Sequence, residues 1–258
     1  MRQPRDTRGI LRPDEGLRHF TLHRDPVPDD LAPYVEWMWG VRWDLPEGTS
    51  HRQETLPAPC VHLVFEQGAF RLHGPNIDRF QIELSGRGWV RGIRFTPAGF
   101  RAFHDLPVRA LANRVVAAES LLVDAPSPPA TFEEARPALL AYLRAHGPRP
   151  DPKIALLNEL VRAAQSDGTL RVDDLAARAR LSTRSLHRAF ADYVGVSTKW
   201  IVRRARVHSA AERVAQGQRV DWAQLAVELG YSDQAHLIRD FRAQIGVTPR
   251  QYARRCGG

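Results

Sequence analysis

A repeated segment near the end of the chain is the feature that most restricts what this sequence can fold into. Leu175-Ala176 and Leu181 are matched 50 residues later by Leu225-Ala226 and Tyr231, and after one added residue the match continues at a spacing of 51. Matches over about 30 residues indicate two copies of one structural unit. The later matched pairs are Leu186 and Leu237, Arg188 and Arg239, Phe190 and Phe241, Gly195 and Gly246, Val196 and Val247, and Ser197 and Thr248.

Each copy carries the signals of two helices joined by a tight turn. Asp221 with Gln224 three residues later forms a capping-box pattern, and Ser182 and Ser232 stand where a second helix is predicted to begin. Gly230 lies in the intervening turn and can take a positive φ. Two helices joined in this way bury a shared face, which leaves the second helix free to enter the major groove of DNA.

The second helix of each copy is predicted to present polar side chains opposite its apolar stripe. An arginine can bind guanine through two hydrogen bonds and a glutamine can bind adenine in the same way, although every solvated helix also has a polar face. We predict that these side chains contact bases. They are Arg184, His187 and Arg188 in the first copy and Gln234, His236 and Arg239 in the second.

A single long helix is predicted between the copies, from Ser197 to Gln216 and closed by Gly217. At ~1.5 Å per residue its length is close to the ~34 Å between successive major-groove faces, so one chain can reach two adjacent turns of DNA. Basic and hydroxyl side chains around the two copies are predicted to contact phosphates. They are Ser182, Lys199, Arg203, Arg204, Ser232, Arg242 and Arg250.

Positive charge is concentrated in the same part of the chain. Of the net charge of +8, residues 1–150 contribute +1 and residues 151–258 contribute +7. Arginine far outnumbers lysine, which a GC-rich genome also produces, but composition alone does not favour one half of a chain. The asymmetry is typical of a domain that binds a polyanion.

The second copy and the residues after it contain a distinctive run of spaced residues. They are Gly230-Tyr231-Ser232-Asp233-Gln234, Leu237, Arg239, Asp240, Phe241, Arg242, Gly246, Val247, Thr248, Pro249 and Tyr252. Through these residues the C-terminal hundred residues resemble the DNA-binding domain of AraC/XylS-type transcriptional regulators. Leu237 stands where that family usually has an aromatic residue. The resemblance implies seven helices, two helix-turn-helix units joined by a long helix, promoter binding, and RNA polymerase as a partner if the protein is an activator.

The N-terminal part is predicted to be α+β, with an antiparallel sheet or small barrel covered by helices. From Glu36 to Leu45 apolar residues alternate with others, which is the period of a strand with one buried face. Short strands are predicted near 61–66, 69–73, 80–84 and 89–95, and helices near 97–103, 108–118 and 131–146. Proline-rich residues 148–152 are predicted to link a domain over 1–147 to an all-α domain over 153–258.

The mouth of such a barrel is a place for a small ligand, although a row of tryptophans on a strand is more often core. The predicted pocket residues are Trp37, Trp39, Trp43, His62 and Trp89. This region also resembles an uncharacterised sensor-type domain that accompanies the DNA-binding module, through His62-Leu63-Val64-Phe65-Glu66, Gly92-Ile93-Arg94-Phe95 and Pro97-Ala98-Gly99-Phe100-Arg101.

Two alternatives to a ligand sensor stay open for the N-terminal domain. It is either an enzyme, for which Glu54, His62 and Glu66 are the loosely plausible set, or a ligand-free dimerisation module. We expect no enzyme, because no catalytic motif occurs. We expect no metal and no cofactor, because His51, His62, His73 and His104 lack a close ligand spacing.

The remaining expectations concern the location of the protein and its partners. No apolar run approaches the ~20 residues that span a bilayer, no signal peptide is recognisable, and the two cysteines cannot make a disulfide framework. We therefore expect a cytoplasmic regulator, activator or repressor, that does not bind membranes. Its expected partners are double-stranded promoter DNA, a small-molecule effector and a second copy of the chain.

Overall fold

The computed structural model describes residues 9–66, 68–215 and 220–255, and the chain divides into two compact units. One unit comprises the chain up to Asn158 together with Ala191–Gly195. The other comprises Glu159–Phe190 and the chain from Val196 onward. The predicted linker at 148–152 precedes this division, which falls inside a helix, α3 (Pro152–Ser166).

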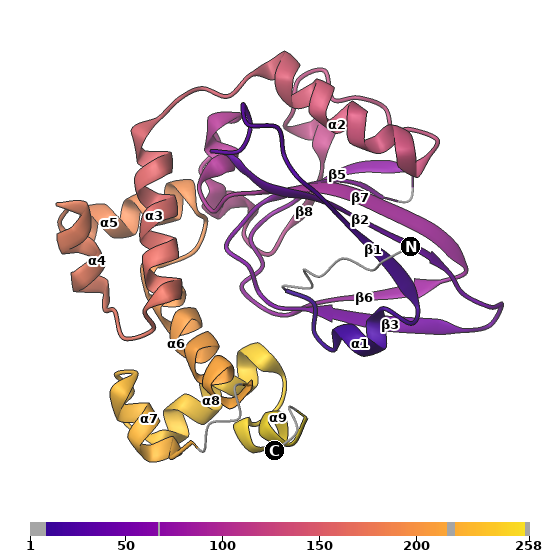
Figure 1. Cartoon of the computed structure of the whole chain (residues 1–258). Coiled ribbons are helices and arrows are strands. Elements are labelled where there is room, and N and C mark those ends of the chain that lie inside the picture. Colours follow the sequence, from indigo (N-terminus) through magenta and orange to yellow (C-terminus); the bar gives the residue numbers. More distant parts are fainter. Residues whose placement is uncertain (1–8, 67, 216–219, 256–258) are drawn as a thin grey trace. The chain divides into compact units, whose positions relative to one another are not determined.

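The first unit is built on two antiparallel sheets (Figure 1). The larger has six strands in the order β1-β2-β7-β4-β5-β8, and the smaller pairs β3 with β6. The predicted antiparallel sheet with helices is thus confirmed. The strands are β1 (Phe20–Asp25), β2 (Val35–Asp44), β3 (Ser50–Thr55), β4 (His62–Glu66), β5 (Ala69–His73), β6 (Phe80–Ser85), β7 (Arg87–Phe95) and β8 (Val115–Ala117).

The strands predicted from alternation are present as β2 and β4 to β7, whereas β1, β3 and β8 were not predicted. The predicted helix over 108–118 is wrong: the chain forms the short 3₁₀ helix η2 (Val108–Leu111) and then β8. Ala112, which follows η2, has an extended ψ of 128° and Asn113 has a φ of 55°, so the helix does not continue, and the β-branched residues after them pair with β5. The predicted helix at 97–103 is the 3₁₀ helix η1 (Gly99–Ala102).

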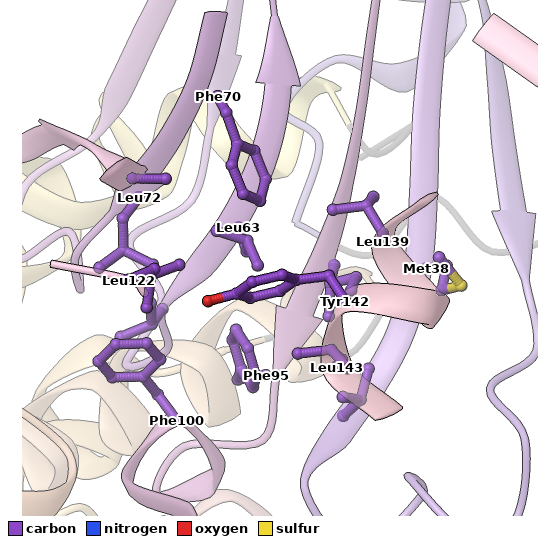
Figure 2. Close-up of a cluster of buried hydrophobic side chains, with 14 of the residues drawn as sticks. Met38, Leu63, Phe70, Leu72, Phe95, Phe100, Leu122, Leu139, Tyr142 and Leu143 are labelled. Carbon is purple, nitrogen blue, oxygen red and sulfur yellow. The ribbon is translucent and has the colours of Figure 1, made fainter. Parts of the chain in front are cut away.

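Helix α2 (Phe132–His146) covers one face of the larger sheet and completes the main core. Thr131 caps the helix, since its hydroxyl accepts a hydrogen bond from the Glu134 N–H while the Glu134 side chain accepts one from the Thr131 N–H. Figure 2 shows the side chains that meet there. Strand residues that alternate onto this face pack against side chains of the helix. The strands contribute Met38, Leu63, Phe70, Leu72 and Phe95, and the helix contributes Leu139, Tyr142 and Leu143.

The second unit is helical. Seven helices follow residue 151 within the described part of the chain, as the family resemblance implies. They are α3, α4 (Val172–Ala179), α5 (Thr183–Tyr193), α6 (Thr198–Ala215), α7 (Trp222–Glu228), α8 (Gln234–Ile245) and α9 (Pro249–Arg255). The first unit adds α1 (Pro13–Gly16) and η3 (Ala118–Ser120). Among the described residues, every helix is too short or too polar to cross a membrane.

Replacing Leu139 by alanine is expected to lower the free energy of unfolding by about 3 kcal/mol, because the side chain is fully buried between α2 and the sheet. Urea unfolding followed by circular dichroism measures the change. Val123→Ala is the control, since Val123 is 71% exposed and its loss should cost less than about 0.5 kcal/mol. Equal effects of the two substitutions would contradict this description of the core.

Candidate nucleic-acid interface and internal cavity

The two copies of the repeat fold into the same helix-turn-helix geometry. At the end of α4 the N–H of Leu181 donates to the carbonyl of Ala176 at 3.0 Å, and at the end of α7 the N–H of Tyr231 donates to that of Ala226 at 2.8 Å. These four residues occupy matched positions of the repeat. The duplication read from the sequence is therefore also a duplication of backbone hydrogen bonds.

The turns differ in the residue that takes the left-handed conformation. Gly230 has a φ of 72°, as its position predicted, but the matched position of the first copy holds Arg180 with a φ of 54°. A left-handed conformation costs a residue with a side chain more than it costs glycine. In the second copy the turn is also approached by Arg206, whose Nη1 donates to the Gly230 carbonyl at 2.9 Å.

The second helices are capped by side-chain oxygens at their first turn. Ser182 Oγ accepts from the Ser185 N–H at 3.2 Å, whereas the cap of α8 is Asp233, whose carboxylate accepts from the His236 N–H at 2.7 Å. The predicted start at Ser232 is thus one residue early, and the shift coincides with the added residue of the second copy. This hydrogen bond lowers the pKa of Asp233.

The capping box predicted at the start of α7 forms only in part. Asp221 accepts hydrogen bonds from the N–H groups of Ala223 and Gln224 at 2.9 and 3.2 Å, so it caps the helix as predicted. The Gln224 side chain does not complete the box, because its Nε2 donates forward to Glu228 Oε1 at 3.0 Å. Glu228, one turn ahead on the same helix face, thus takes the place of the Asp221 backbone as the partner of the Gln224 side chain.

Matched apolar side chains fix which face of each second helix points inward. Leu186 and Phe190 in α5, and Leu237 and Phe241 in α8, are all 0% exposed. Leu237 is therefore a core residue despite its departure from the family's usual aromatic. Burial of these four side chains turns the opposite face of each helix toward solvent.

Four of the six predicted base-contact residues are exposed on those opposite faces: Arg184 and Arg188 on α5, and Gln234 and Arg239 on α8. The two histidines are half-buried and have neighbours within the domain. His187 Nδ1 lies 3.1 Å from Thr198 Oγ1, and the nearest hydroxyl to His236 Nδ1 is that of Ser232 at 3.4 Å. The structure thus brings the arginines and Gln234 to the surface and ties the histidines to the scaffold.

The predicted phosphate-contact residues also divide into exposed side chains and side chains with partners inside the domain. Lys199, Arg203, Arg242 and Arg250 are exposed, and Arg204 is half-buried. Ser182 is engaged as a helix cap, while the exposed Ser232 hydroxyl lies 3.3 Å from Asp233 Oδ2. Basic side chains on α6, α8 and α9 are therefore open to solvent, and the hydroxyls take part in the helix starts.

Arg203 holds α6 against α8 rather than standing free. Its Nε donates to Asp240 Oδ2 at 2.9 Å, its Nη2 donates to Asp240 Oδ1, and Asp240 is 4% exposed. Hydrogen bonding to this carboxylate raises the pKa of Arg203. A buried carboxylate needs such a partner, so this placement favours a structural role for Arg203 over a phosphate contact. The sequence signal was available: Asp240 lies on the buried stripe between Leu237 and Phe241.

The connecting helix α6 begins at Thr198, close to the predicted start. Its predicted end at Gln216 and Gly217 lies outside the described residues. Buried apolar side chains along α6, including Ile201, Ala205 and Val214, pack it between the two helix-turn-helix units, which lie at its two ends (Figure 1). The helix therefore acts as a spacer of fixed length.

A separate feature, in the first unit, is an internal cavity of about 180 Å³ between the smaller sheet and the face of the larger sheet that α2 does not cover. Of the predicted pocket residues, Trp39 and His62 line it. Trp43 and Trp89 instead line a second hollow at the edge of the sheet, and Trp37 packs beneath the guanidinium groups of Arg24 and Arg94. The predicted set is thus divided among three places.

The residues considered for catalysis do not form one site. Glu66 lines the cavity with His62, but Gln53 and Thr55 line it from β3 and the intervening Glu54 points to the other face of that strand. Glu54 there accepts hydrogen bonds from Arg79 and Gln81. Among the described residues, no three His, Cys, Asp or Glu side chains form a group that could hold a metal ion.

Two family models match this chain. Residues 24–117 match a model described as a domain of unknown function (DUF6597), and residues 175–255 match one described as a helix-turn-helix domain. The second match contains both copies of the repeat. The C-terminal region is an AraC-type helix-turn-helix domain.

Curated relatives of this chain include the regulatory protein PocR of Salmonella typhimurium, 33% identical over 109 residues, which are 41% of this chain and 35% of that protein. The transcriptional activator RhrA of Rhizobium meliloti is 23% identical over 127 residues, 48% of this chain and 40% of that protein. The chain thus spans well under half the length of these relatives. A solved structure of the AdpA DNA-binding domain in complex with a target DNA is 25% identical, covers 42% of this chain and 100% of that chain, and has a TM-score of 0.33.

His208 in α6 is expected to make the AraC-type domain sensitive to acid. Its Nε2 is buried without a hydrogen-bond partner among the described residues, and burial lowers its pKa to about 3. Below pH 6.5 the unfolded chain takes up a proton that the folded chain does not, so stability falls with falling pH, by about 2 kcal/mol at pH 5.

Urea unfolding of the full chain and of His208→Leu at pH 7 and pH 5, followed by circular dichroism at 222 nm, measures this dependence. The variant should lose less stability than the wild type between the two pH values. The same loss in both proteins would show that His208 is not the group responsible.

Proposed function

We propose that the chain is a sequence-specific DNA-binding transcriptional regulator that reads promoter DNA through α5 and α8. The observation that carries this proposal is the matched exposure of Arg188 and Arg239. They occupy the same position of the repeat, opposite buried leucine and phenylalanine side chains. An arginine at that place on a groove-sized helix is suited to guanine, whose O6 and N7 atoms accept two hydrogen bonds.

The proposed mechanism divides affinity from specificity. Lys199, Arg242 and Arg250 neutralise phosphates and supply binding that weakens with salt. Arg188, Arg239 and Gln234 contact base edges and supply the choice of sequence. The concentration of positive charge in residues 151–258 supports this division, because it places the attraction to DNA in the same domain as the reading helices.

The length of α6 supports simultaneous contact of both helix-turn-helix units with DNA. The helix runs over Thr198–Ala215, which at ~1.5 Å per residue is about 27 Å, comparable to the ~34 Å between successive major-groove faces. The Arg203–Asp240 ion pair fixes the second helix-turn-helix unit, through α8, to this spacer helix. We propose that one chain occupies two adjacent major-groove segments on the same side of the duplex.

The first unit, in this proposal, senses a small molecule. Its cavity lies between two sheets and is lined mainly by apolar side chains with a few polar ones, which is the composition of a small-ligand site. Ligand binding then changes the affinity for DNA by favouring one conformation of the regulator. A homodimer, RNA polymerase as a partner of an activator, and a cytoplasmic location belong to the same proposal.

Arg188→Ala and Arg239→Ala are each expected to reduce discrimination between a selected site and random DNA by ~1–3 kcal/mol, because each removes a base contact. The site is obtained by selecting from random duplexes with the full chain. Fluorescence anisotropy at several salt concentrations gives both affinities.

Lys199→Ala is the matched control for this experiment. Loss of a phosphate contact should weaken both affinities equally and reduce the salt slope by about 1. Equal losses on selected and random DNA for the two arginine variants would contradict base reading by α5 and α8. Failure to select any site would contradict the proposed function itself.

A further inference from the structure

The walls of the cavity in the first unit show which class of molecule it fits. The larger sheet contributes Leu22, Val41 and Val90, and the smaller sheet contributes Phe80 and Ile82. The Trp39 indole forms part of the wall and lies close to Gly92. A Cβ on Gly92 would lie 3.2 Å from the indole Cε2 and 2.9 Å from the Leu63 carbonyl oxygen. The glycine therefore leaves room for the indole to lie close to the strand, and the space is bounded mostly by apolar surface.

The polar side chains at one end of the cavity are already bound to one another. Trp39 Nε1 donates to His62 Nδ1 at 3.1 Å, and because an indole N–H can only donate, Nδ1 is the acceptor. The neutral imidazole then carries its proton on Nε2, which lies 3.4 Å from Cys60 Sγ. Burial, together with the charge of Arg94, holds the pKa of His62 well below its usual value, so the ring is neutral at pH 7.

Gln53 and Glu66, two further polar residues of the wall, also have hydrogen-bond partners. Gln53 Nε2 donates to the carbonyls of Leu11 and Glu54 at 2.9 and 2.7 Å, and its Oε1 lies 3.3 Å from His51 Nε2. Glu66 Oε1 is bound by His73 Nε2 at 3.2 Å and by Arg71 Nε at 3.1 Å. A ligand that needed the Gln53 amide or Glu66 Oε1 would have to compete with these partners.

The two arginines of the wall, Arg24 and Arg94, both lie over the Trp37 ring, and Arg94 also binds the Glu36 carboxylate. Their guanidinium carbons lie 4.7 Å (Arg24) and 4.5 Å (Arg94) from the centre of the Trp37 ring, and Arg94 Nε donates to Glu36 at 2.7 Å. An anionic ligand would have to compete with Glu36 and lose its own hydration. The arrangement therefore favours an uncharged molecule.

We propose that the cavity binds a small, uncharged, mainly apolar molecule of about the size of one aromatic ring with short alkyl substituents. The size follows from the volume: an apolar cavity of about 150 Å³ holds benzene, and this one measures about 180 Å³. An aromatic ring can also pack against the Trp39 indole. This inference rests on the proposed sensor role of the first unit, and it adds the chemistry of the ligand.

The experiment compares two probes that share a ring and a methyl group and differ in charge: p-xylene and p-toluate. Differential scanning fluorimetry of the full chain with saturating p-xylene should raise the Tm by about 4 °C or more, as expected for a ligand that binds only the folded state. p-Toluate at the same concentration should raise it by less than about 1 °C. A larger shift with p-toluate would overturn the proposal in favour of an anionic ligand, and a shift with neither probe would overturn it as well.

Two cavity-filling variants show whether the shift arises in this cavity. Val90→Phe fills it from the larger sheet and Ile82→Phe from the smaller, and each variant that folds should lose the response to p-xylene. Val115→Phe is the matched control, because Val115 is 48% exposed in β8 and does not line the cavity. It should respond as the wild type does. A full response in both filled variants would overturn the assignment.

Binding of selected DNA, measured on the same proteins, separates this inference from the proposed function. If p-xylene stabilises the chain and DNA affinity is unchanged by it, the ligand class stands and the sensor role fails. If DNA affinity responds to p-toluate but not to p-xylene, the sensor role stands and the ligand class fails.

Discussion

Burial of one leucine and one phenylalanine in each copy of the repeat is the constraint on which the DNA-binding half of the structure depends. Because Phe190 and Phe241 are fully buried, the helical period leaves Arg188 and Arg239 no position except the outer face. The same constraint accounts for the Arg203–Asp240 ion pair, since a carboxylate on the buried stripe requires a cation from a neighbouring helix. The packing of these helices and the exposure of their arginines therefore both follow from the spacing of the buried leucine and phenylalanine.

Features encoded within short stretches of sequence were predictable, and those that depend on distant residues were not. The alternation around Trp37 to Trp43 predicted β2, and the two copies of the repeat predicted four helices and their turns. By contrast, β8 is three residues long and exists because β5 offers it a partner. The polar Ser50–Thr55 becomes β3 for a similar reason, through pairing with β6.

The candidate sites show the same division. Exposure of the arginines on α5 and α8 followed from helical period alone, but engagement of His187 by Thr198 and of Arg203 by Asp240 required knowledge of which helices meet. Trp39 and His62 belong to the predicted set of pocket residues, and both line the cavity. The remaining walls came from β3 and β6, whose separation in sequence hid their contribution to the cavity.

The turns at Arg180 and Gly230 cannot be exchanged between the two copies with equal effect. Arg180 already tolerates the left-handed conformation, at a cost of about 1 kcal/mol, whereas a side chain at position 230 would also place its Cβ 3.0 Å from Arg206 Nη2. A chimera that carries the glycine turn in both units keeps a relaxed backbone throughout. One that carries the arginine turn in both requires the end of the Arg206 side chain, which binds the carbonyl at this turn, to shift by a few tenths of an ångström, so exchanging the turns has different effects in the two copies.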